Sequence, residues 1–334
     1  MDLDDGKQRQ RGSVRYSRGM SRTAGPVVVL AGGVGAARFL DGLIRVMPEP
    51  EVFVVVNVGD DMEWCGLHIA PDIDTVLYTL SDQVNPETGW GLRDESFRAL
   101  ERAKSLGGPD WFTIGDQDLG LHLARTSRLA GGETLSEVTG DMARSFGLGC
   151  TVTPVTDGRL RTMVEIEDGE VAFQEYFVER GQRDEVQGLR FDGADVSEAA
   201  PGVHEAINGA RSIIIAPSNP FLSIGPILAV PGVRDCLLTR SARVAAISPI
   251  VGGAAIKGPA ARIMESLGHE VSALGVARLY ADLADVFVVD EVDVGLAPSI
   301  EEETGMRCVV TPTIMRGPEE KQALARVTLA ALST

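Results

Sequence analysis

Four carboxylates lie within fifteen residues in the first quarter of the chain, a density that suits a divalent cation. Asp60 and Asp61 follow an apolar run, and Asp72 and Asp74 stand where a helical pattern begins. Asp72 by itself would be an ordinary helix N-cap, and one acid after the run would suffice for a ribose hydroxyl. Because hard cations prefer carboxylate oxygens, we expect these four residues to hold Mg²⁺.

A glycine-rich turn precedes the acids. Gly32, Gly33 and Gly35 follow the apolar run 27–31 and open a helical pattern. Glycines let backbone N–H groups approach an anion, and a helix N-terminus favours negative charge, so the turn predicts a phosphate site. It is not a P-loop, and Arg38 stands where a dinucleotide fingerprint has its third glycine. A tight turn without a ligand is the alternative.

Polar residues and glycines also follow two later apolar runs. Ser218 and Asn219 come after 213–216, and Ser248 and Gly252 come after 244–247. Open α/β sheets bind ligands at the carboxyl ends of their strands, so we expect these residues to contribute to nucleotide or phosphate binding.

A further polar segment contains Asp116, Asp118, His122 and Arg125. The acids are typical of helix N-caps and the histidine of an ordinary surface position. Arg125, together with Arg128, also suits an anionic ligand.

Short uninterrupted apolar runs predict the elements that position these residues. Six runs read as buried, mostly parallel strands, at 27–31, 52–56, 213–216, 244–247, 286–289 and 308–310. Helical patterns separate most of them, so we expect an α/β protein with a Rossmann-like open, mostly parallel sheet.

The middle of the chain has a different pattern. Residues 118–146 are helical in pattern, 161–179 predict a hairpin turning at Asp168-Gly169, and 180–200 read as an irregular loop. We therefore expect a single domain over 26–334 with a helical and β-hairpin insertion at about 118–200. Residues 1–25 carry few large apolar side chains and are expected to be a disordered extension.

Composition excludes several classes of protein. Acidic residues outnumber basic ones by 48 to 31, which gives a net charge of −17 and argues against nucleic acid as a partner. No run of about 18 apolar residues and no secretory signal is present, so we expect a cytoplasmic protein without membrane contact. The four cysteines form no C-x-x-C motif, which argues against a zinc knuckle or disulfide framework.

Taken together, these segments resemble the 2-phospho-L-lactate transferase family (CofD-like) of deazaflavin coenzyme F-420 biosynthesis, over about residues 27–331. The motifs that carry the resemblance are GGVGAAR at 32–38, NVGDD at 57–61, PDIDTVLYTL at 71–80, GDQD at 115–118, TLSEVT at 134–139, FQEYF at 173–177, APSNP at 216–220, SIGPIL at 223–228 and SPIVGG at 248–253. Family members often have Arg where this chain has Gln117.

The resemblance implies a Mg²⁺-dependent transferase. It would join the phospho-three-carbon-acid moiety of a guanylyl-activated donor to the ribityl 5′-hydroxyl of 7,8-didemethyl-8-hydroxy-5-deazariboflavin, releasing GMP. The donor is lactyl-, enolpyruvyl- or glyceryl-2-diphospho-5′-guanosine. The resemblance further implies deazaflavin contacts at Asp74 and Thr113, catalytic roles among Asp60, Asp61 and Asp74, and a homodimer.

Two other functions use the same residues. An NAD(P)-dependent dehydrogenase would employ the glycine turn, with Asp60 on a ribose hydroxyl. A non-catalytic deazaflavin- or nucleotide-binding protein would keep the binding residues and need no metal.

Overall fold

The computed structural model describes residues 25–256 and 258–333. The extension predicted at 1–25 lies outside the described residues except for Gly25.

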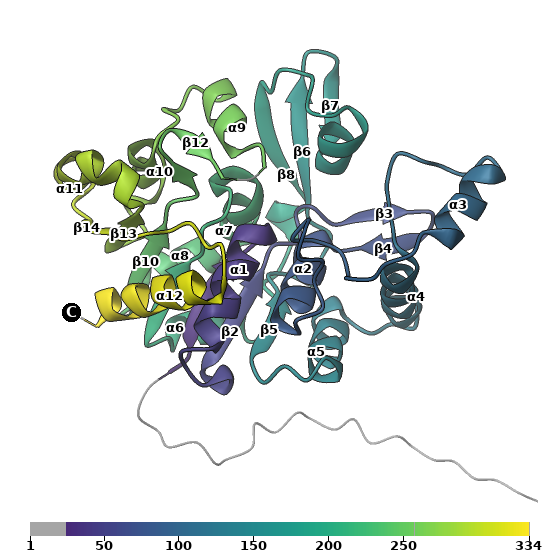
Figure 1. Cartoon of the computed structure of the whole chain (residues 1–334), viewed down its shortest axis with the longest axis horizontal. Helices are drawn as coiled ribbons and strands as arrows, with labels where there is room; N and C mark the ends of the chain where they lie inside the picture. The colour runs from purple at the N-terminus through teal and green to yellow at the C-terminus, as the bar shows by residue number, and fades with distance from the viewer. Residues whose placement is uncertain (1–24, 257, 334) are drawn as a thin grey trace, which may run out of the picture.

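A seven-stranded parallel sheet forms the centre of the molecule, in the order β14-β13-β10-β9-β1-β2-β5 (Figure 1). The strands are β1 (Val27–Ala31), β2 (Val52–Val56), β5 (Thr151–Pro154), β9 (Ser212–Ile215), β10 (Arg243–Ile247), β13 (Val286–Val289) and β14 (Arg307–Val310). The chain winds outward from β1 in one direction and from β9 in the other, so the order reverses between these two neighbours. The predicted Rossmann-like α/β class is confirmed.

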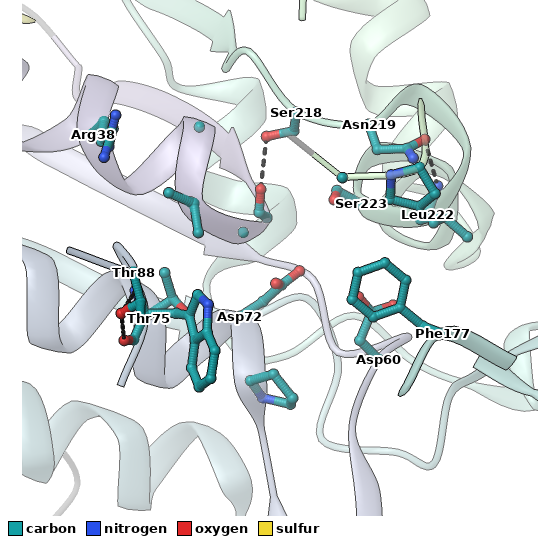
Figure 2. A pocket seen from close by; sticks show the side chains of 18 of the residues that line it. Arg38, Asp60, Asp72, Thr75, Thr88, Phe177, Ser218, Asn219, Leu222 and Ser223 are labelled. Atoms are coloured by element: carbon teal, nitrogen blue, oxygen red, sulfur yellow. Dashed lines mark hydrogen bonds between the residues drawn. The ribbon is translucent and has the colours of Figure 1, made fainter. Parts of the chain in front are cut away.

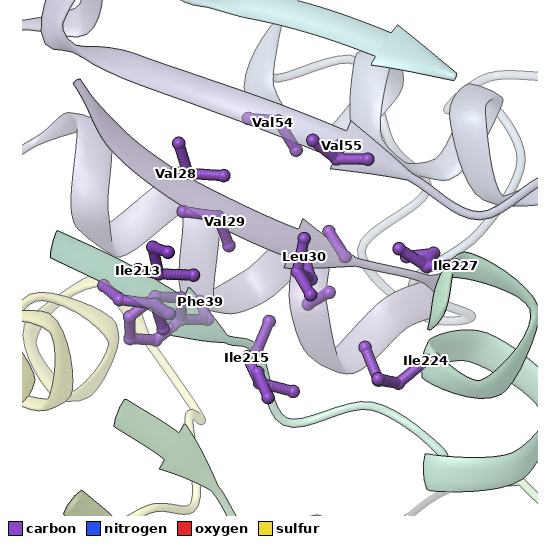
Figure 3. Packing of buried hydrophobic residues seen from close by; sticks show 14 of the residues in the cluster. Val28, Val29, Leu30, Phe39, Val54, Val55, Ile213, Ile215, Ile224 and Ile227 are labelled. Atoms are coloured by element: carbon purple, nitrogen blue, oxygen red, sulfur yellow. The ribbon is translucent and has the colours of Figure 1, made fainter. Parts of the chain in front are cut away.

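Apolar side chains on both faces of the sheet explain why its strands are uninterrupted apolar runs. Every residue of β1 and β13 is buried. Figure 3 shows Val29 and Leu30 of β1 beside Ile213 and Ile215 of β9, with Phe39 packed against them. Burial on two faces requires helices on both sides, and this leaves the strand ends as the open edge of the sheet.

Twelve α-helices and five shorter helical turns surround the sheet in the described part of the chain. The α-helices are α1 (Gly33–Ile44), α2 (Pro71–Leu80), α3 (Arg98–Ser105), α4 (Asp116–Ala130), α5 (Leu135–Ser145), α6 (Val203–Asn208), α7 (Gly225–Ala229), α8 (Val233–Thr239), α9 (Ala260–Ser266), α10 (Ala273–Tyr280), α11 (Ala297–Thr304) and α12 (Pro318–Leu332). The shorter turns are η1 (Glu49–Glu51), η2 (Glu175–Glu179), η3 (Ala194–Val196), η4 (Pro220–Ile224) and η5 (Glu291–Leu296). Helix α1 packs against both α2 and α12.

Smaller sheets stand beyond the carboxyl edge and at one side of the central sheet (Figure 1). A three-stranded sheet, β7-β6-β8, consists of β6 (Arg161–Ile166), β7 (Gly169–Ala172) and β8 (Gly188–Asp192). The hairpins β3 (Met62–Trp64) with β4 (Leu67–Ile69), and β11 (Ile250–Val251) with β12 (Ala254–Ala255), complete the set. The hairpin predicted within 161–179 is present, with its turn one residue earlier, at Glu167 and Asp168.

Two strands depart from the sequence prediction. The sheet has a seventh strand, β5, so the segment 118–200 contains a strand of the central sheet as well as the added hairpin. Strand β5 is short, lies at the sheet edge and ends in Pro154, which an edge tolerates. The prediction of an irregular loop at 180–200 was wrong for β8, which pairs with β6 and is half-buried except at the exposed Arg190.

No single helix among residues 25–256 and 258–333 is long and apolar enough to cross a membrane. The pair Pro220–Ala229 and Val233–Thr239, bent by 89°, meets the length and composition criteria when the two are taken together.

Candidate active site

A cavity of about 660 Å³ opens at the carboxyl edge of the central sheet, where the loops after β1, β2, β9, β10 and β14 meet. The reversal of strand order between β1 and β9 is the usual ligand position in such folds. Most of the residues predicted for the site line this cavity: Gly32, Gly33, Gly35, Asp60, Asp72, Asp74, Thr113, Ser218, Asn219 and Ser248. Asp61 and Gly252 do not line it.

The glycine turn forms one wall of the cavity. Gly33 begins α1 with φ +70°, a conformation that favours glycine. A Cβ on Gly35 would lie 2.2 Å from the Pro217 carbonyl oxygen, so the turn must approach the loop after β9 closely. Gly35 itself does not have a positive φ, so the close approach alone requires glycine at this position. Helix α1 has no acid in its own first turn, and the Gly33 N–H at its N-terminus donates to the Asp72 carboxylate.

The loop after β9 completes this wall. Ser218 donates its hydroxyl hydrogen to the Gly32 carbonyl at 2.9 Å and thereby joins the two loops at the point of strand reversal (Figure 2). The Asn219 Oδ1 accepts from the backbone N–H groups of Phe221 and Leu222 at 2.9 and 3.2 Å. Its amide nitrogen is buried and has no hydrogen-bond partner among the described residues, which leaves a donor for a ligand.

Asp60 and Asp72 face the cavity opposite Ser218 and Asn219 (Figure 2). The Asn57 amide donates to Asp72 Oδ2 at 2.8 Å and to the Leu222 carbonyl at 3.2 Å. Asp60 Oδ1 is buried and has no partner among the described residues. Burial and the nearby negative charges raise the pKa of Asp60, and burial raises the pKa of Asp72 to about 7. A cation between these carboxylates would relieve both effects.

Asp61 does not line the cavity, and its Oδ1 is buried without a hydrogen-bond partner among the described residues. Its Oδ2 lies 3.0 Å from His68 Nε2, and burial raises its pKa although His68 opposes the shift. His68 belongs to β4, so Asp61 attaches the β3–β4 hairpin to the loop after β2. The four acids therefore differ in their partners: Asp61 contacts His68 and Asp74 contacts Arg125, although the charge of Asp61 still acts on Asp60 and Asp72.

Asp74 is engaged by a buried arginine. Both of its carboxylate oxygens accept from the Arg125 guanidinium, with Nη1 at 3.1 Å from Oδ2. The Arg125 side chain is fully buried, so the expectation that it contacts an anionic ligand was wrong. Arg128, the other arginine considered for that role, pairs with Glu133 and Asp141.

A second set of polar groups adjoins Asp74. Ligand atoms of Asp74, Asp118 and His122 lie within 4.8 Å of one another, a spacing compatible with a divalent metal ion. Asp118 also accepts from the Tyr78 hydroxyl at 2.5 Å. Burial tends to raise the pKa of Asp118, but the nearby His122 and the Tyr78 hydroxyl outweigh it, and the pKa lies below its ordinary value.

Aromatic side chains also line the cavity, and Phe177 lies beside Asp60 (Figure 2). Thr113 is exposed there, next to Phe112, which packs against Trp111 with ring centroids 5.6 Å apart. Trp90 lines the same cavity and is 54% exposed, and Phe177 lines it from η2. Exposed aromatic faces beside a cavity suit a flat ring system.

Ser248 and Gly252 have local roles. The Ser248 hydroxyl donates to the Ile250 carbonyl at 2.8 Å, closing the turn after β10 at the cavity wall. The Gly252 N–H donates to the Asp293 carboxylate at 3.0 Å, outside the cavity.

Sequence reasoning missed the segment after β14. Thr313, Met315 and Arg316 line the cavity, and the Arg38 guanidinium donates to the Met315 carbonyl at 3.3 Å. The Asp290 carboxylate fixes this segment by accepting from the backbone N–H and the hydroxyl of Thr313, at 2.7 and 3.0 Å. The sequence did offer one signal for this segment: it follows the apolar run 308–310, and loops that follow parallel strands lie at the carboxyl edge of the sheet.

Comparison with known proteins agrees with the architecture. Residues 27–310 match the family model described as 2-phospho-L-lactate transferase CofD. The chain is 42% identical over 309 residues to a phosphoenolpyruvate transferase of Streptomyces griseus, covering 91% of this chain and 97% of the relative. It is 36% identical to a 2-phospho-L-lactate transferase of Methanosarcina mazei, covering 91% of this chain and all of the relative.

Among solved structures, a member of the UPF0052 family from Bacillus halodurans superposes with a TM-score of 0.62 at 17% identity. The match covers 92% of this chain and all of that one, and it supports the fold. The resemblance inferred from the motifs is confirmed: the chain belongs to the 2-phospho-L-lactate transferase family.

Proposed function

We propose that the protein transfers the phospho-three-carbon-acid moiety of a guanylyl-activated donor to 7,8-didemethyl-8-hydroxy-5-deazariboflavin, releasing GMP, in coenzyme F-420 biosynthesis. The observation that carries the proposal is a single cavity with three different walls: a glycine turn at a helix N-terminus, the pair Asp60 and Asp72, and a set of aromatic side chains. The transferase family and the names of its relatives support this choice.

The donor would lie along the glycine turn. The N-terminus of α1 and the free amide of Asn219 provide donors for phosphate oxygens, and Ser218 holds the turn in place. Arg38 and Arg316 line the same cavity and supply positive charge in a protein whose net charge is −17. These groups suit a diphosphate better than they suit a neutral ligand.

Asp60 and Asp72 are the predicted acids that fit Mg²⁺. Both face the cavity, both have raised pKa values, and Asp60 retains a buried oxygen without a partner. Bound Mg²⁺ would neutralise diphosphate charge and stabilise the leaving GMP. Of the other two acids that the sequence analysis grouped with them, Asp74 is bound by Arg125 through both oxygens, and Asp61 contacts His68 through Oδ2 and does not line the cavity.

The reaction forms one O–P bond and breaks another. The ribityl 5′-hydroxyl oxygen bonds to the phosphorus that carries the three-carbon acid, and the anhydride bond to GMP breaks with its electron pair on GMP. The hydroxyl proton requires an acceptor. An Asp60 carboxylate oxygen that does not bind Mg²⁺ can take this role, because the residue lines the cavity.

The deciding experiment combines the purified protein with the deazaflavin, Mg²⁺ and each of the three activated donors in turn, and reads the product by mass. We expect a deazaflavin adduct with at least one donor, and none from the Asp60→Asn variant. Absence of an adduct with all three donors would overturn the proposal. Relatives named for phosphoenolpyruvate and for phospholactate make these two donors the first to compare.

A thermal-shift panel separates the other functions. GDP and deazaflavin should raise the melting temperature, with Mg²⁺ strengthening the effect of GDP, whereas NAD should not. Stabilisation by NAD alone would favour a dehydrogenase. We further propose a cytoplasmic homodimer, and light scattering on the purified protein tests its oligomeric state.

A further inference from the structure

Two carboxylates near the aromatic wall of the cavity, Asp74 and Asp118, differ in what holds them. Arg125 binds both oxygens of Asp74, and the guanidinium is itself fully buried. A buried bidentate pair fixes the carboxylate and consumes its strongest acceptor positions. Asp74 is therefore a rigid part of the wall.

The His122 imidazole lies between the two acids and is oriented by the same arginine. Its Nδ1 lies 3.3 Å from Arg125 Nη1, which can only donate a hydrogen bond. When Nδ1 accepts this hydrogen bond, the ring hydrogen lies on Nε2. That nitrogen lies 3.3 Å from Asp118 Oδ1, and the ring is almost completely buried.

Asp118 consequently has one oxygen in use and one free. Its Oδ1 accepts from the Tyr78 hydroxyl at 2.5 Å and lies 3.3 Å from His122 Nε2, a contact without hydrogen-bond geometry. Its Oδ2 has no hydrogen-bond partner in the described part of the chain, although the residue lines the cavity and its side chain is 19% exposed. Because the Tyr78 hydroxyl fixes the Asp118 carboxylate through Oδ1, Oδ2 is held in one direction as a hydrogen-bond acceptor.

We propose that Asp118 determines acceptor specificity: its Oδ2 accepts a hydrogen bond from an N–H or O–H group on the planar ring of the substrate. The inference rests on the proposed function for the identity of that substrate. The ring is the part concerned because Phe112 and Thr113 line the cavity from the same segment as Asp118, whereas the reacting hydroxyl must reach the wall formed by Asp60 and Asp72. An ionised acceptor makes the stronger hydrogen bond.

A metal ion at Asp74, Asp118 and His122 is the competing interpretation of the same atoms. The Arg125 guanidinium already supplies positive charge at Asp74, and the His122 nitrogen nearest to Asp74, Nδ1, is occupied by that guanidinium. A divalent ion bound to Asp74 would have to displace this guanidinium from the carboxylate. The observations therefore favour a hydrogen-bonding role for Asp118.

The test compares the affinities of two proteins for the substrate and its analogues, in the manner of a double-mutant cycle. Affinity is measured by titration calorimetry in EDTA. The substrates are the deazaflavin and analogues methylated at the ring N–H or at the ring hydroxyl, and the proteins are wild type and Asp118→Asn. In the variant, Tyr78 still donates to the amide oxygen, so an NH₂ group replaces Oδ2 and faces the substrate's donor. We expect one methylation to weaken binding to wild type about 10–100-fold and to change binding to the variant less than about threefold.

Asp116→Asn is the matched control. It removes the same charge two residues earlier in α4, where Asp116 binds Ser96 and the backbone of residues 98 and 99 and does not line the cavity. This variant should retain the full methylation penalty. Because the penalty is a ratio measured on folded protein, partial unfolding of either variant cannot imitate its loss.

Three results would overturn the inference. The first is a methylation penalty that persists in Asp118→Asn, and the second is equal affinity of wild type and variant for the unmodified substrate. The third is a loss of affinity that appears only with added divalent metal, together with weaker metal binding by the variant, which would assign Asp118 to a metal site. If wild type binds no deazaflavin, the proposed function fails as well; if it binds and the penalty persists, only this inference fails.

Discussion

Replacing Asp72 by Asn should make the metal-free protein more stable and less active. Asp72 is buried beside Asp60, and burial raises its pKa to about 7 from an ordinary value of 3.8. The folded protein therefore holds a proton that the unfolded chain releases between these two pH values. Stability falls as pH rises through this window, because the folded state binds more protons than the unfolded state.

The magnitude follows from the two pKa values. Their difference of about 3 corresponds to about 4 kcal/mol, at about 1.36 kcal/mol for each pH unit, and the full amount is felt above pH 7. Asparagine keeps an oxygen for the 2.8 Å hydrogen bond from Asn57, but it adds an NH₂ group whose incomplete pairing costs about 1–3 kcal/mol. At pH 8 the net gain in free energy of unfolding should be about 1–3 kcal/mol.

Urea denaturation in EDTA, at pH 8 and at pH 4.5, measures the effect. The variant should be more stable than wild type at pH 8, and this advantage should shrink or reverse at pH 4.5, where wild-type Asp72 is protonated when folded. Mg²⁺ should stabilise wild type more than the variant, since Asp72 is a proposed ligand. An advantage that is equal at both pH values would refute the reasoning from burial and charge.

The other predictions concern neighbouring positions. Asp74→Asn should destabilise the protein by about 3–5 kcal/mol in urea denaturation, because it leaves Arg125 buried without a counter-charge; an unchanged midpoint would show that the ion pair contributes little. Gly35→Ala should lower the melting temperature even without ligand, because the new Cβ would clash with the Pro217 carbonyl oxygen. We expect a loss of about 1–3 kcal/mol in the free energy of unfolding. Gly120→Ala, in α4 with no atom within 4 Å of the new Cβ, should instead stabilise by about 0.5–1 kcal/mol. EDTA should abolish turnover and Mg²⁺ restore it, and full activity in EDTA would contradict the proposed metal.

The sequence was sufficient to predict the strands that are buried on both faces. A strand such as β13, with all four residues buried, must be an apolar run, and a run of that length between helical patterns has few other interpretations. Strand β5 was not predicted because two of its four residues are Thr and one is Pro, so it is not an apolar run. Its place at the edge of the sheet is set by pairing with β2, which no local pattern reports.

The sequence predicted most of the residues that line the candidate site, but not which side chains contact one another there. Spacing placed Asp60, Asp72 and Asp74 in one region, and all three line one cavity. Spacing could not show that Arg125, 51 residues further on, binds Asp74, because that contact depends on how α4 packs beside α2. Charge counts therefore grouped four acids that the folded chain separates into different environments.

The cavity is joined by contacts between residues very far apart in the chain. Ser218 bonds to Gly32 across 186 positions, and Arg38 bonds to Met315 across 277. During synthesis, the glycine turn emerges from the ribosome long before either partner exists. The last wall, at 313–316, follows the end of the family match at residue 310, so a fragment cut there would keep all seven strands and lack part of the binding surface. The cavity is therefore complete only when nearly the whole chain has folded, and we expect a fragment ending at residue 310 to bind ligand more weakly than the full chain.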